Sequence, residues 1–340
     1  MFETGHPTSA GRCYRSLPGS DAGGVESRGH IIICSCRVLV LNPKYARNTF
    51  QKVGLALIVC AANLALNAAP PHTEKSPVNP AHYTSYRTSG PITIDGKLDE
   101  PDWQRAPRSS AFVDIVTGRP AWFDTRVSIL WDEKYLYFGF RAEEPDVRAT
   151  LTVHDSKIYE DNDLEIFIAG RDAYYEFEIN ALNTVYDVFW IWQDMYFPLS
   201  PYNVPEWNPQ GRNAAVLDGV GGHVHPRGKR NGFIDWDFPG LLHAVHVDGT
   251  LNKHDDKDAS WSAEIAFPWA GLKWLADGRA LPPKDGDVWR IDASRFQHFA
   301  PDGKLVEPAA GWTWNRHGHY DSHIPETFSY VHFSSSPIPR

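Results

Sequence analysis

Cysteine is absent from most of this chain of 340 residues. The sequence has four cysteines, at positions 13, 34, 36 and 60, and none after residue 60. No disulfide framework can therefore hold the main body together, and that part of the chain has neither a thiol nucleophile nor a thiolate metal site.

Glycine-rich phosphate loops and long apolar runs are missing too. No glycine-rich loop opens a helix-like segment, which disfavours nucleotide binding. The longest apolar run, residues 53–66, is short for a helix that spans a bilayer. It follows the basic residues Lys44, Arg47 and Lys52 and precedes small residues, which is the pattern of a signal peptide at about residues 44–69.

This leader divides the chain into three parts. Residues 1–69 are predicted to be an N-terminal extension with the signal peptide, residues 70–81 a linker, and residues 82–340 the main domain. We therefore expect a secreted or periplasmic protein without a stable membrane span. A lipoprotein attached through Cys60 is disfavoured, because Val59 stands where a small residue is expected.

Basic residues are scarce once the leader is set aside. Residues 1–69 hold seven of the 33 Lys and Arg residues and three of the 42 Asp and Glu residues, so the rest has a formal net charge of −13. Such a surface repels phosphate backbones. Nucleic acid and anionic lipid are poor partners for it, whereas neutral, hydroxyl-rich ligands and divalent cations are suitable.

Apolar and polar residues alternate with period two in short runs bounded by Gly, Pro, Asp and Asn. The runs cover residues 125–131, 135–141, 164–168, 175–179, 185–190, 243–247, 261–267, 288–293 and 328–333. One face of such a sheet is buried and the other is solvated. We predict an all-β fold, an antiparallel β-sandwich with short helical pieces such as residues 268–275 and one long irregular insertion at residues 198–240.

Tryptophan is abundant in the main domain. All 13 tryptophans lie beyond residue 100, more than a core of this size usually needs, so we expect some to face a ligand. In the segment 159–169, Tyr159 and several carboxylates lead into an alternating strand. An aromatic ring can cover the apolar face of a sugar, and carboxylates accept hydrogen bonds from hydroxyls or hold calcium. A charged turn before an edge strand is the alternative interpretation.

Several motifs in order resemble carbohydrate-binding module family 9 and its relatives over about residues 91–333. They are residues 92–103 (ITIDGKLDEPDW), 131–137 (WDEKYLY), 160–168, 175–183, 289–295 and 323–331. The resemblance implies a β-sandwich that binds glycans, often at a chain end between two facing aromatic rings, with calcium ions as structural supports.

The resemblance also implies particular sugar contacts. Tyr159 falls where the family has a platform tryptophan, Glu165 where it has a sugar-contacting carboxylate, and Asn180 where it has a polar sugar contact. Glu178 stands where an arginine is expected, which changes the hydroxyl pattern that can be recognised. The second ring is expected from Trp314, which polar residues follow, or from Trp312. Both tryptophans could instead fill the core.

Two further sets of residues suit metal ions. Asp95, Asp99 and Glu100 form an oxygen-rich cluster that suits calcium, although the spacing is not that of an EF-hand, and a solvated turn is the alternative. Two pairs of histidines, His223 with His225 and His317 with His319, could hold a transition metal if a carboxylate joined them. The alternative is that they bind no metal, as is common for histidines in loops. A haem-binding electron carrier with Met195 as an axial ligand is another alternative.

The expected function is that of an exported, non-catalytic carbohydrate-binding protein in polysaccharide utilisation, with chain ends as one mode of recognition. The alternative from another class is a glycoside hydrolase that uses Glu165 and a second acid on O-glycosyl bonds, with residues 198–240 as a lid. The sequence contains no nucleophile elbow, no metalloprotease helix motif and no recognisable Ser-His-Asp order. Binding is therefore favoured over catalysis.

Overall fold

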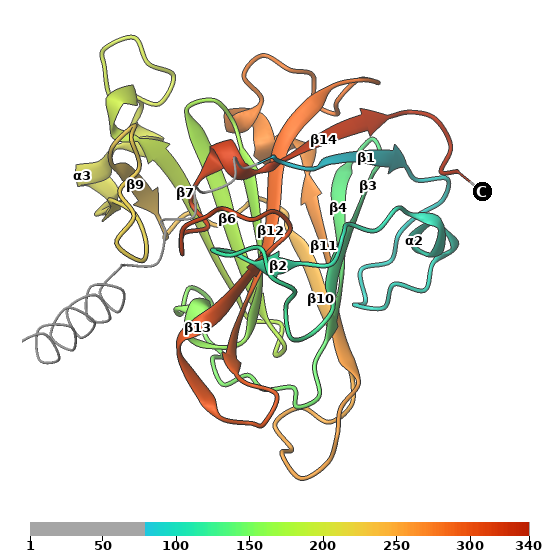
Figure 1. The fold of residues 1–340 in the computed structure, drawn as a ribbon. Helices are drawn as coiled ribbons and strands as arrows, with labels where there is room; N and C mark the ends of the chain where they lie inside the picture. The colour runs from blue at the N-terminus through green and yellow to red at the C-terminus, as the bar shows by residue number, and fades with distance from the viewer. Residues whose placement is uncertain (1–78, 340) are drawn as a thin grey trace, which may run out of the picture. The chain divides into compact units, whose positions relative to one another are not determined.

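The computed structural model describes residues 79–339 (Figure 1). The N-terminal extension and signal peptide predicted at residues 1–69 lie outside the described residues, as does most of the linker predicted at residues 70–81. Within the part of the chain that is described, no helix has both the length and the apolar character needed to cross a membrane.

Strands dominate the described chain, as the sequence predicts. They are β1 (His82–Arg87), β2 (Val113–Asp114), β3 (Thr125–Trp131), β4 (Tyr135–Glu143), β5 (Asp163–Ala169), β6 (Ala173–Asn180), β7 (Val185–Trp192), β8 (Ala215–Leu217), β9 (Arg230–Phe233), β10 (Leu242–Asp248), β11 (Ser260–Pro268), β12 (Val288–Phe299), β13 (Leu305–Thr313) and β14 (Ser329–Ser334). The helical pieces are α2 (Pro101–Arg105), α3 (Pro209–Arg212) and the 3-10 turns η2 (Ile158–Glu160), η3 (Gln193–Met195), η4 (Pro205–Trp207), η5 (Trp269–Leu275) and η6 (Pro325–Thr327).

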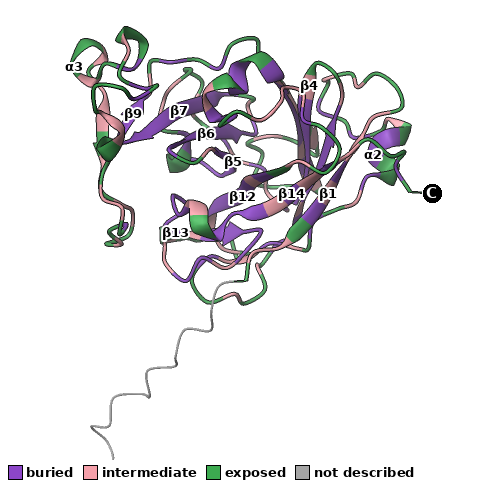
Figure 2. Ribbon diagram, turned by 90° about the horizontal axis from the view of Figure 1, so that it is seen from above, coloured by how far each residue is buried: buried purple, intermediate pink, exposed green. Residues whose placement is uncertain are grey.

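One hydrogen-bonded path joins the strands in the order β10-β11-β4-β3-β1-β14-β12-β5-β6-β7-β9-β8, with β13 branching from β12 to β2. The path folds into two layers, one built on β4 and β11 and the other on β12, β5, β6 and β7 (Figures 1 and 2). β1 runs parallel to both β14 and β3, so the sheet is mixed, although the other strand pairs are antiparallel.

The core lies between the two layers. Phe177 of β6 packs edge-on against Phe267 of β11 at 5.6 Å between ring centroids, and Phe138 of β4 contacts the same ring at 5.6 Å. All three rings are fully buried. Residues of both layers thus fill one sandwich core, and the predicted β-sandwich is confirmed.

Alternation along β5 sends two kinds of side chain to opposite faces. Leu164, Ile166 and Ile168 belong to the core, whereas Asp163 and Glu165 point to the outer face of their layer. That outer face therefore carries carboxylates on the middle strands of a sheet, away from the apolar core.

The insertion predicted as irregular at residues 198–240 contains regular structure, so that prediction is wrong in this respect. Its strands β8 and β9 extend the sheet beyond β7. Trp207 in the insertion is fully buried and stacks on Phe189 of β7 at 4.4 Å. A Cβ at Gly232 would lie 2.3 Å from the Trp190 ring, so this position of β9 requires glycine. Pairing and packing against β7 supply the order that the local sequence pattern does not indicate.

The motif at residues 92–103 packs on the outer face of the β4/β11 layer. Glu264 of β11 is fully buried there and accepts hydrogen bonds from the backbone N–H groups of Asp95 (2.9 Å) and Gly96 (2.8 Å) and from Trp103 Nε1 (2.7 Å). Burial raises the pKa of Glu264 to about 7. A Cβ at Gly96, where φ is +85°, would lie 2.5 Å from the carbonyl carbon of Val245. The motif is thus a covering turn fitted to one buried carboxylate.

Candidate functional site

A row of polar side chains crosses the outer face of the other layer. In the strand register, Glu165 of β5 lies directly opposite Glu178 of β6. Ser294 of β12 pairs with Glu165 from one side, and Tyr186 of β7 pairs with Glu178 from the other. Because directly opposite residues on one face have their side chains in contact range, four strands bring a hydroxyl, two carboxylates and a phenol together.

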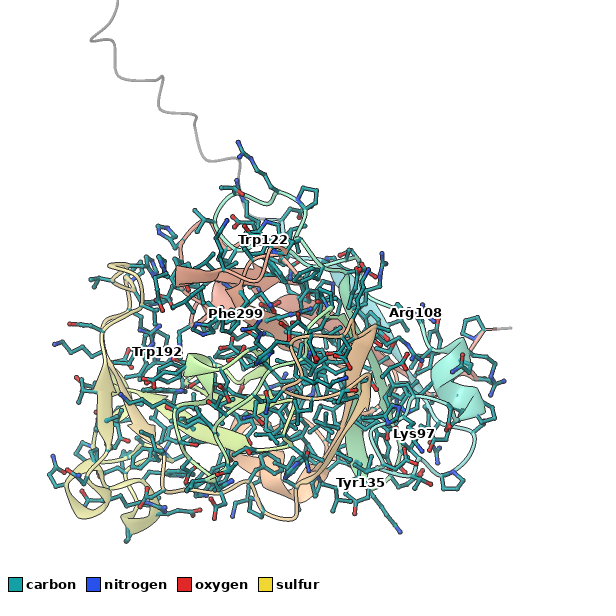
Figure 3. The ribbon with its side chains drawn as sticks, turned by 90° about the horizontal axis from the view of Figure 1, so that it is seen from below. Lys97, Arg108, Trp122, Tyr135, Trp192 and Phe299 are labelled. Atoms are coloured by element: carbon teal, nitrogen blue, oxygen red, sulfur yellow. The ribbon has the colours of Figure 1, made fainter. Side chains whose placement is uncertain are left out.

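A pocket of about 1110 Å³ opens over this row. Its volume lies slightly above the range of about 300–1000 Å³ that is usual for small-molecule sites. Three carboxylates of β5 and β6 line it, Glu165, Glu176 and Glu178, together with those of Glu160, Asp161 and Glu307. Its aromatic rings are those of Tyr159, Tyr186, Trp190, Phe296, Phe299 and Tyr320. Residues of β8 complete the lining. In Figure 3, Phe299 lies toward the same side of the molecule as Trp192, and Lys97, Arg108 and Tyr135 lie toward the other side.

Tyr159 lies on η2 at the edge of the pocket with 42% of its surface exposed. Its ring meets the Tyr186 ring edge-on at 6.0 Å, and its carbonyl oxygen accepts a hydrogen bond from His298 Nε2 at 2.9 Å. Across the pocket lining, the Arg148 guanidinium lies 4.0 Å from the centroid of the Phe299 ring. The structure thus brings Tyr159 together with Glu165 and Glu178, and it leaves much of the tyrosine ring open to a ligand.

Asn180 lies beneath the pocket surface and is fully buried. Its Nδ2 donates to the Leu151 carbonyl (2.8 Å) and to Asp161 Oδ2 (3.0 Å), and its Oδ1 accepts from the N–H groups of Leu182 and Thr184. Every polar atom of this amide is engaged by the protein. Asn180 therefore holds the loop that carries Asp161, which does line the pocket.

Trp312 and Trp314 lie in the sandwich core, 2% and 4% exposed, and neither lines the pocket. Trp312 packs edge-on against Trp122 at 5.6 Å and lies under the Arg295 guanidinium at 5.1 Å. Trp314 packs edge-on against Tyr83 at 5.4 Å. The structure thus gives both rings the core packing that the sequence left as an alternative, and β12 contributes aromatic rings to the pocket instead.

Three carboxylates of this face lie close enough to interact strongly. The side-chain oxygens of Asp163, Glu165 and Glu178 include one from each residue within 4.8 Å of one another. Burial, with repulsion from Asp292, raises the pKa of Glu165 to about 7, although a hydrogen bond from Ser294 opposes the shift. Burial and neighbouring carboxylates raise the pKa of Glu178 as well. The site is therefore strongly electronegative whenever these groups are ionised.

Glu176 and Asp292, on the neighbouring row of this face, have their own partners. Trp190 Nε1 donates to Glu176 Oε2 at 2.6 Å, and His323 Nε2 lies 3.2 Å from Glu176 Oε1. The imidazole of His317 lies 2.9 Å from Asp292 Oδ2, and both side chains are fully buried. Glu176 and Asp292 thus have hydrogen-bond partners of their own, although their charges still raise the pKa values of Glu178 and Glu165.

The calcium residues expected from the sequence lie elsewhere. Asp95 Oδ1 accepts a hydrogen bond from the Lys97 N–H at 2.9 Å, and Glu100 Oε1 accepts one from the Thr93 N–H at 2.9 Å. Among the described residues, Asp95, Asp99 and Glu100 are not one of the groups whose oxygens converge within metal-binding distance. The turn uses two of these carboxylates to bind its own backbone.

The histidine pairs have carboxylate partners of their own. His223 Nδ1 lies 2.7 Å from Asp321 Oδ2, His225 Nε2 lies 2.9 Å from Glu326 Oε2, and the His223 and His319 rings pack at 4.2 Å. Within residues 79–339, these side chains do not converge as a group of three metal ligands. Met195 of η3 packs against the buried apolar clusters and does not line the pocket.

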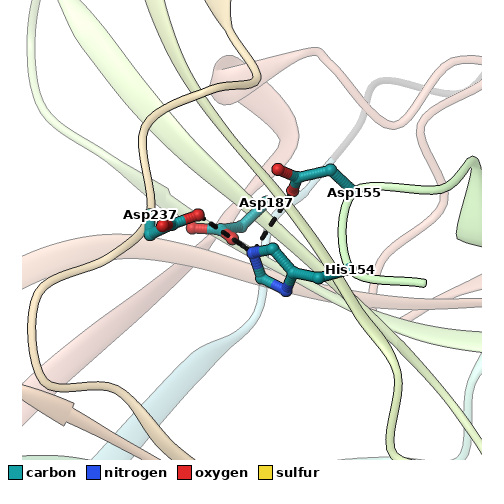
Figure 4. Close-up of side chains that lie close together, drawn as sticks. All are labelled: His154, Asp155, Asp187 and Asp237. Atoms are coloured by element: carbon teal, nitrogen blue, oxygen red, sulfur yellow. Dashed lines mark hydrogen bonds and ion pairs between the residues drawn. The ribbon is translucent and has the colours of Figure 1, made fainter. Parts of the chain in front are cut away.

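A second acidic cluster surrounds His154 (Figure 4). His154 Nε2 lies 2.9 Å from Asp237, 3.4 Å from Asp155 and 3.6 Å from Asp187. Burial alone would lower the pKa of His154, but the three carboxylates together raise it. Asp187 Oδ2 also accepts hydrogen bonds from the Tyr175 hydroxyl and the Phe238 N–H. The imidazole thus links three acidic side chains away from the pocket lining.

Comparison with known proteins finds similarity to solved structures. No family model matches the sequence, and no curated protein matches it significantly. A solved structure described as a "putative carbohydrate-binding protein" from Bacteroides uniformis is similar with a TM-score of 0.50 and 14% identity, covering 75% of this chain and 100% of that chain. At this identity the likeness concerns the fold alone.

Two further solved structures are family 9 carbohydrate-binding modules from Caldicellulosiruptor kristjanssonii. One, in complex with cellotriose, has a TM-score of 0.41 and 11% identity, and covers 75% of this chain and 95% of that chain. The other, in complex with glucose, has a TM-score of 0.39 and 10% identity, and covers 76% of this chain and 98% of that chain. The fold of this chain is thus shared with the Bacteroides uniformis protein.

Proposed function

We propose that this protein binds carbohydrate in the pocket over β5, β6 and β7. The observation that carries the proposal is the combination of a half-exposed tyrosine, further aromatic rings and two facing glutamates in one cavity of about 1110 Å³. Aromatic rings suit the apolar faces of sugars, and carboxylates suit their hydroxyls. The fold shared with a protein described as carbohydrate-binding supports the same function.

Each residue has a defined role in this proposal. The exposed ring of Tyr159 covers the C–H face of a sugar, while Glu165 and Glu178 accept hydrogen bonds from its hydroxyl groups. Ionised carboxylates are acceptors only, so a sugar that points ether oxygens at them leaves their lone pairs unpaired. The glutamate pair thus selects sugars that present hydroxyl groups to the pocket floor.

We also propose that the protein is exported and acts in polysaccharide utilisation, either secreted or periplasmic. The leader pattern at about residues 44–69 and the formal net charge of −13 on the rest of the chain support this proposal. Glycan chain ends are the proposed targets, because recognition of a chain end is what the sequence resemblance to family 9 modules implies.

Isothermal titration with xylan, cellulose and pectin oligosaccharides tests the site. Tyr159→Ala should bind the recognised oligosaccharide about tenfold to hundredfold more weakly, since burying an aromatic side chain contributes about 1.5–3 kcal/mol. Trp122→Ala is the matched control, because this ring is 46% exposed and lies outside the pocket lining. Equal affinities of wild type and Tyr159→Ala would overturn the site assignment.

Chromatography of the same mixtures tests the hydrolase alternative. Intact oligosaccharides after prolonged incubation fit a binding protein. Shortened products would instead give Glu165 and Glu178 the roles of a catalytic carboxylate pair.

A further inference from the structure

The cluster of Asp163, Glu165 and Glu178 combines three acidic groups in a place with almost no contact with solvent. Asp163 and Glu165 come from β5 and Glu178 from β6, and their exposed fractions are 0%, 2% and 1%. Ionised carboxylates at such depth are costly unless hydrogen bonds or a cation compensate for the lost hydration.

The described residues compensate these carboxylates only in part. Glu165 accepts a hydrogen bond from the Ser294 hydroxyl, and Asp163 Oδ1 accepts one from the Phe296 N–H at 2.8 Å. Asp163 Oδ2 and Glu178 Oε2 are buried and have no hydrogen-bond donor among the described residues. Two oxygens of the cluster are thus left for a ligand.

The buried cation near this cluster is committed to other groups. Arg295 donates to Glu144 Oε2 (2.7 Å) and Gln297 Oε1 (2.8 Å), and to the Thr125 hydroxyl and the Glu143 carbonyl. Its charge acts on Asp163 from a distance, without a hydrogen bond between the two in the structure. The three carboxylates therefore lack a directly bonded positive partner among the described side chains.

Size and ligand chemistry both favour calcium. Calcium–oxygen distances of about 2.3–2.6 Å put oxygens on opposite sides of the ion about 4.6–5.2 Å apart and adjacent oxygens closer. A spread of 4.8 Å or less therefore fits a single calcium ion. The ligands are all carboxylate oxygens, which suits a hard cation, and magnesium demands a stricter octahedral geometry.

The pocket leaves room for further ligands. Calcium takes six to eight oxygen ligands, more than three carboxylates supply when at least one binds through a single oxygen. Glu165 and Glu178 line the cavity, so the unfilled positions of an ion between them would face it. Adjacent hydroxyl groups of a sugar ring offer two oxygens at a spacing that one cation can bind.

We propose that Asp163, Glu165 and Glu178 hold a calcium ion at the pocket floor, and that adjacent sugar hydroxyls complete its coordination. The second part rests on the proposed carbohydrate binding, whereas the first part stands without it. This site differs from the turn at Asp95, Asp99 and Glu100 in burial and in its unpaired oxygens.

Calcium titration of the purified, chelator-treated protein tests the ion site. Calcium should bind with measurable heat and raise the unfolding temperature more than magnesium does. Glu178→Gln and Asp163→Asn should each weaken calcium binding by at least about 100-fold, since even partners outside the ligand shell are worth about 10- to 100-fold. Both substitutions are nearly isosteric, and two variants are used so that a folding defect in one of them does not decide the result.

Asp95→Asn is the matched control, because it removes an acidic group from the exposed turn and leaves the pocket unchanged. It should bind calcium as the wild type does. Absence of calcium binding by the wild type would overturn the proposal, as would loss of binding in Asp95→Asn with full binding in Glu178→Gln.

Oligosaccharide titration in calcium and in excess chelator tests the bridging role. Binding only in the presence of calcium would support both parts. Calcium binding without any oligosaccharide binding would support the ion site and remove the proposed function. Equal oligosaccharide binding in calcium and in chelator would overturn the bridging role while leaving carbohydrate binding intact.

Discussion

Each outer face of the sandwich carries a buried glutamate, and the two glutamates differ in their hydrogen bonding. Glu264 on the β4/β11 layer and Glu178 on the β5/β6 layer are 0% and 1% exposed. The turn at residues 92–103 supplies donors to both oxygens of Glu264. By contrast, Glu178 Oε2 faces no donor among the described residues. The protein thus saturates one carboxylate with its own groups and leaves the other incompletely paired beside a cavity.

The difference distinguishes a structural carboxylate from one available to a ligand. Burial alone does not separate them, and neither does residue type or strand position. The number of hydrogen-bond donors to each oxygen does distinguish the two carboxylates, because a buried carboxylate that the fold requires is hydrogen-bonded. Variants on the two faces should therefore change stability in opposite directions.

Replacing Glu264 should give the largest effect. Glu264→Ala leaves two backbone N–H groups and the Trp103 indole N–H without their acceptor, so we expect a loss of about 3–5 kcal/mol in the free energy of unfolding. Urea unfolding measures it, with Glu307→Ala as the control on an exposed carboxylate. A loss below about 1 kcal/mol would contradict the structural role.

Asp102 provides a smaller, pH-dependent test on the same face. Burial would raise its pKa, but hydrogen bonds from Ser89, Arg105 and the Gly90 N–H lower it below the usual 3.8. A carboxyl group with a lowered pKa in the folded state stabilises the protein above pH 3.8, and this stabilisation is lost as the pH falls through the folded-state pKa. Asp102→Asn should cost about 1–2 kcal/mol at pH 7.

Unfolding of wild type and Asp102→Asn at pH 7 and under strongly acidic conditions gives the comparison. The difference between their free energies of unfolding should become markedly smaller in acid, where the carboxyl group is protonated. A gap that does not change with pH would show that Asp102 acts through packing alone.

Replacing Glu178 should change the free energy of unfolding least, and it should increase that free energy where the other two replacements decrease it. Without calcium, Glu178→Gln removes one of two directly opposed acidic groups, and such like-charge pairs cost about 0.2–1 kcal/mol. We expect the free energy of unfolding to rise by that amount when a chelator is present. Urea unfolding measures this change, with Glu165→Gln measured in parallel. Destabilisation by more than about 1 kcal/mol would place Glu178 with Glu264 among the structural carboxylates.

Strand alternation made part of the site predictable. The period of two in residues 164–168 and 175–179 places Glu165 and Glu178 on the face opposite the core, and the acidic segment before β5 marks Tyr159. Asp163 precedes the run recognised in the sequence, and its unpaired oxygen depends on where β12 lies. Contacts between distant strands, not local pattern, create that feature.

The two tryptophans show a limit of the same reasoning. Alternation puts side chains two positions apart on one face without saying which face is inward. β13, which carries Trp312, contains Pro308 and few large apolar residues, so its strand was not apparent from the sequence. Its pairing with β12 and β2 turns Trp312 toward the core.

The parallel strand β1 gives the molecule a particular order of assembly. β1 joins β3 to β14, and its His82 ring lies 2.8 Å from that of His332, 250 positions later. During synthesis, the hydrogen-bonded link between the two layers through β1 can therefore form only after β14 has been made. Contacts of such long sequence separation fold slowly and leave strand edges open in the meantime. The link between the layers is the last part of the sandwich that a growing chain can complete.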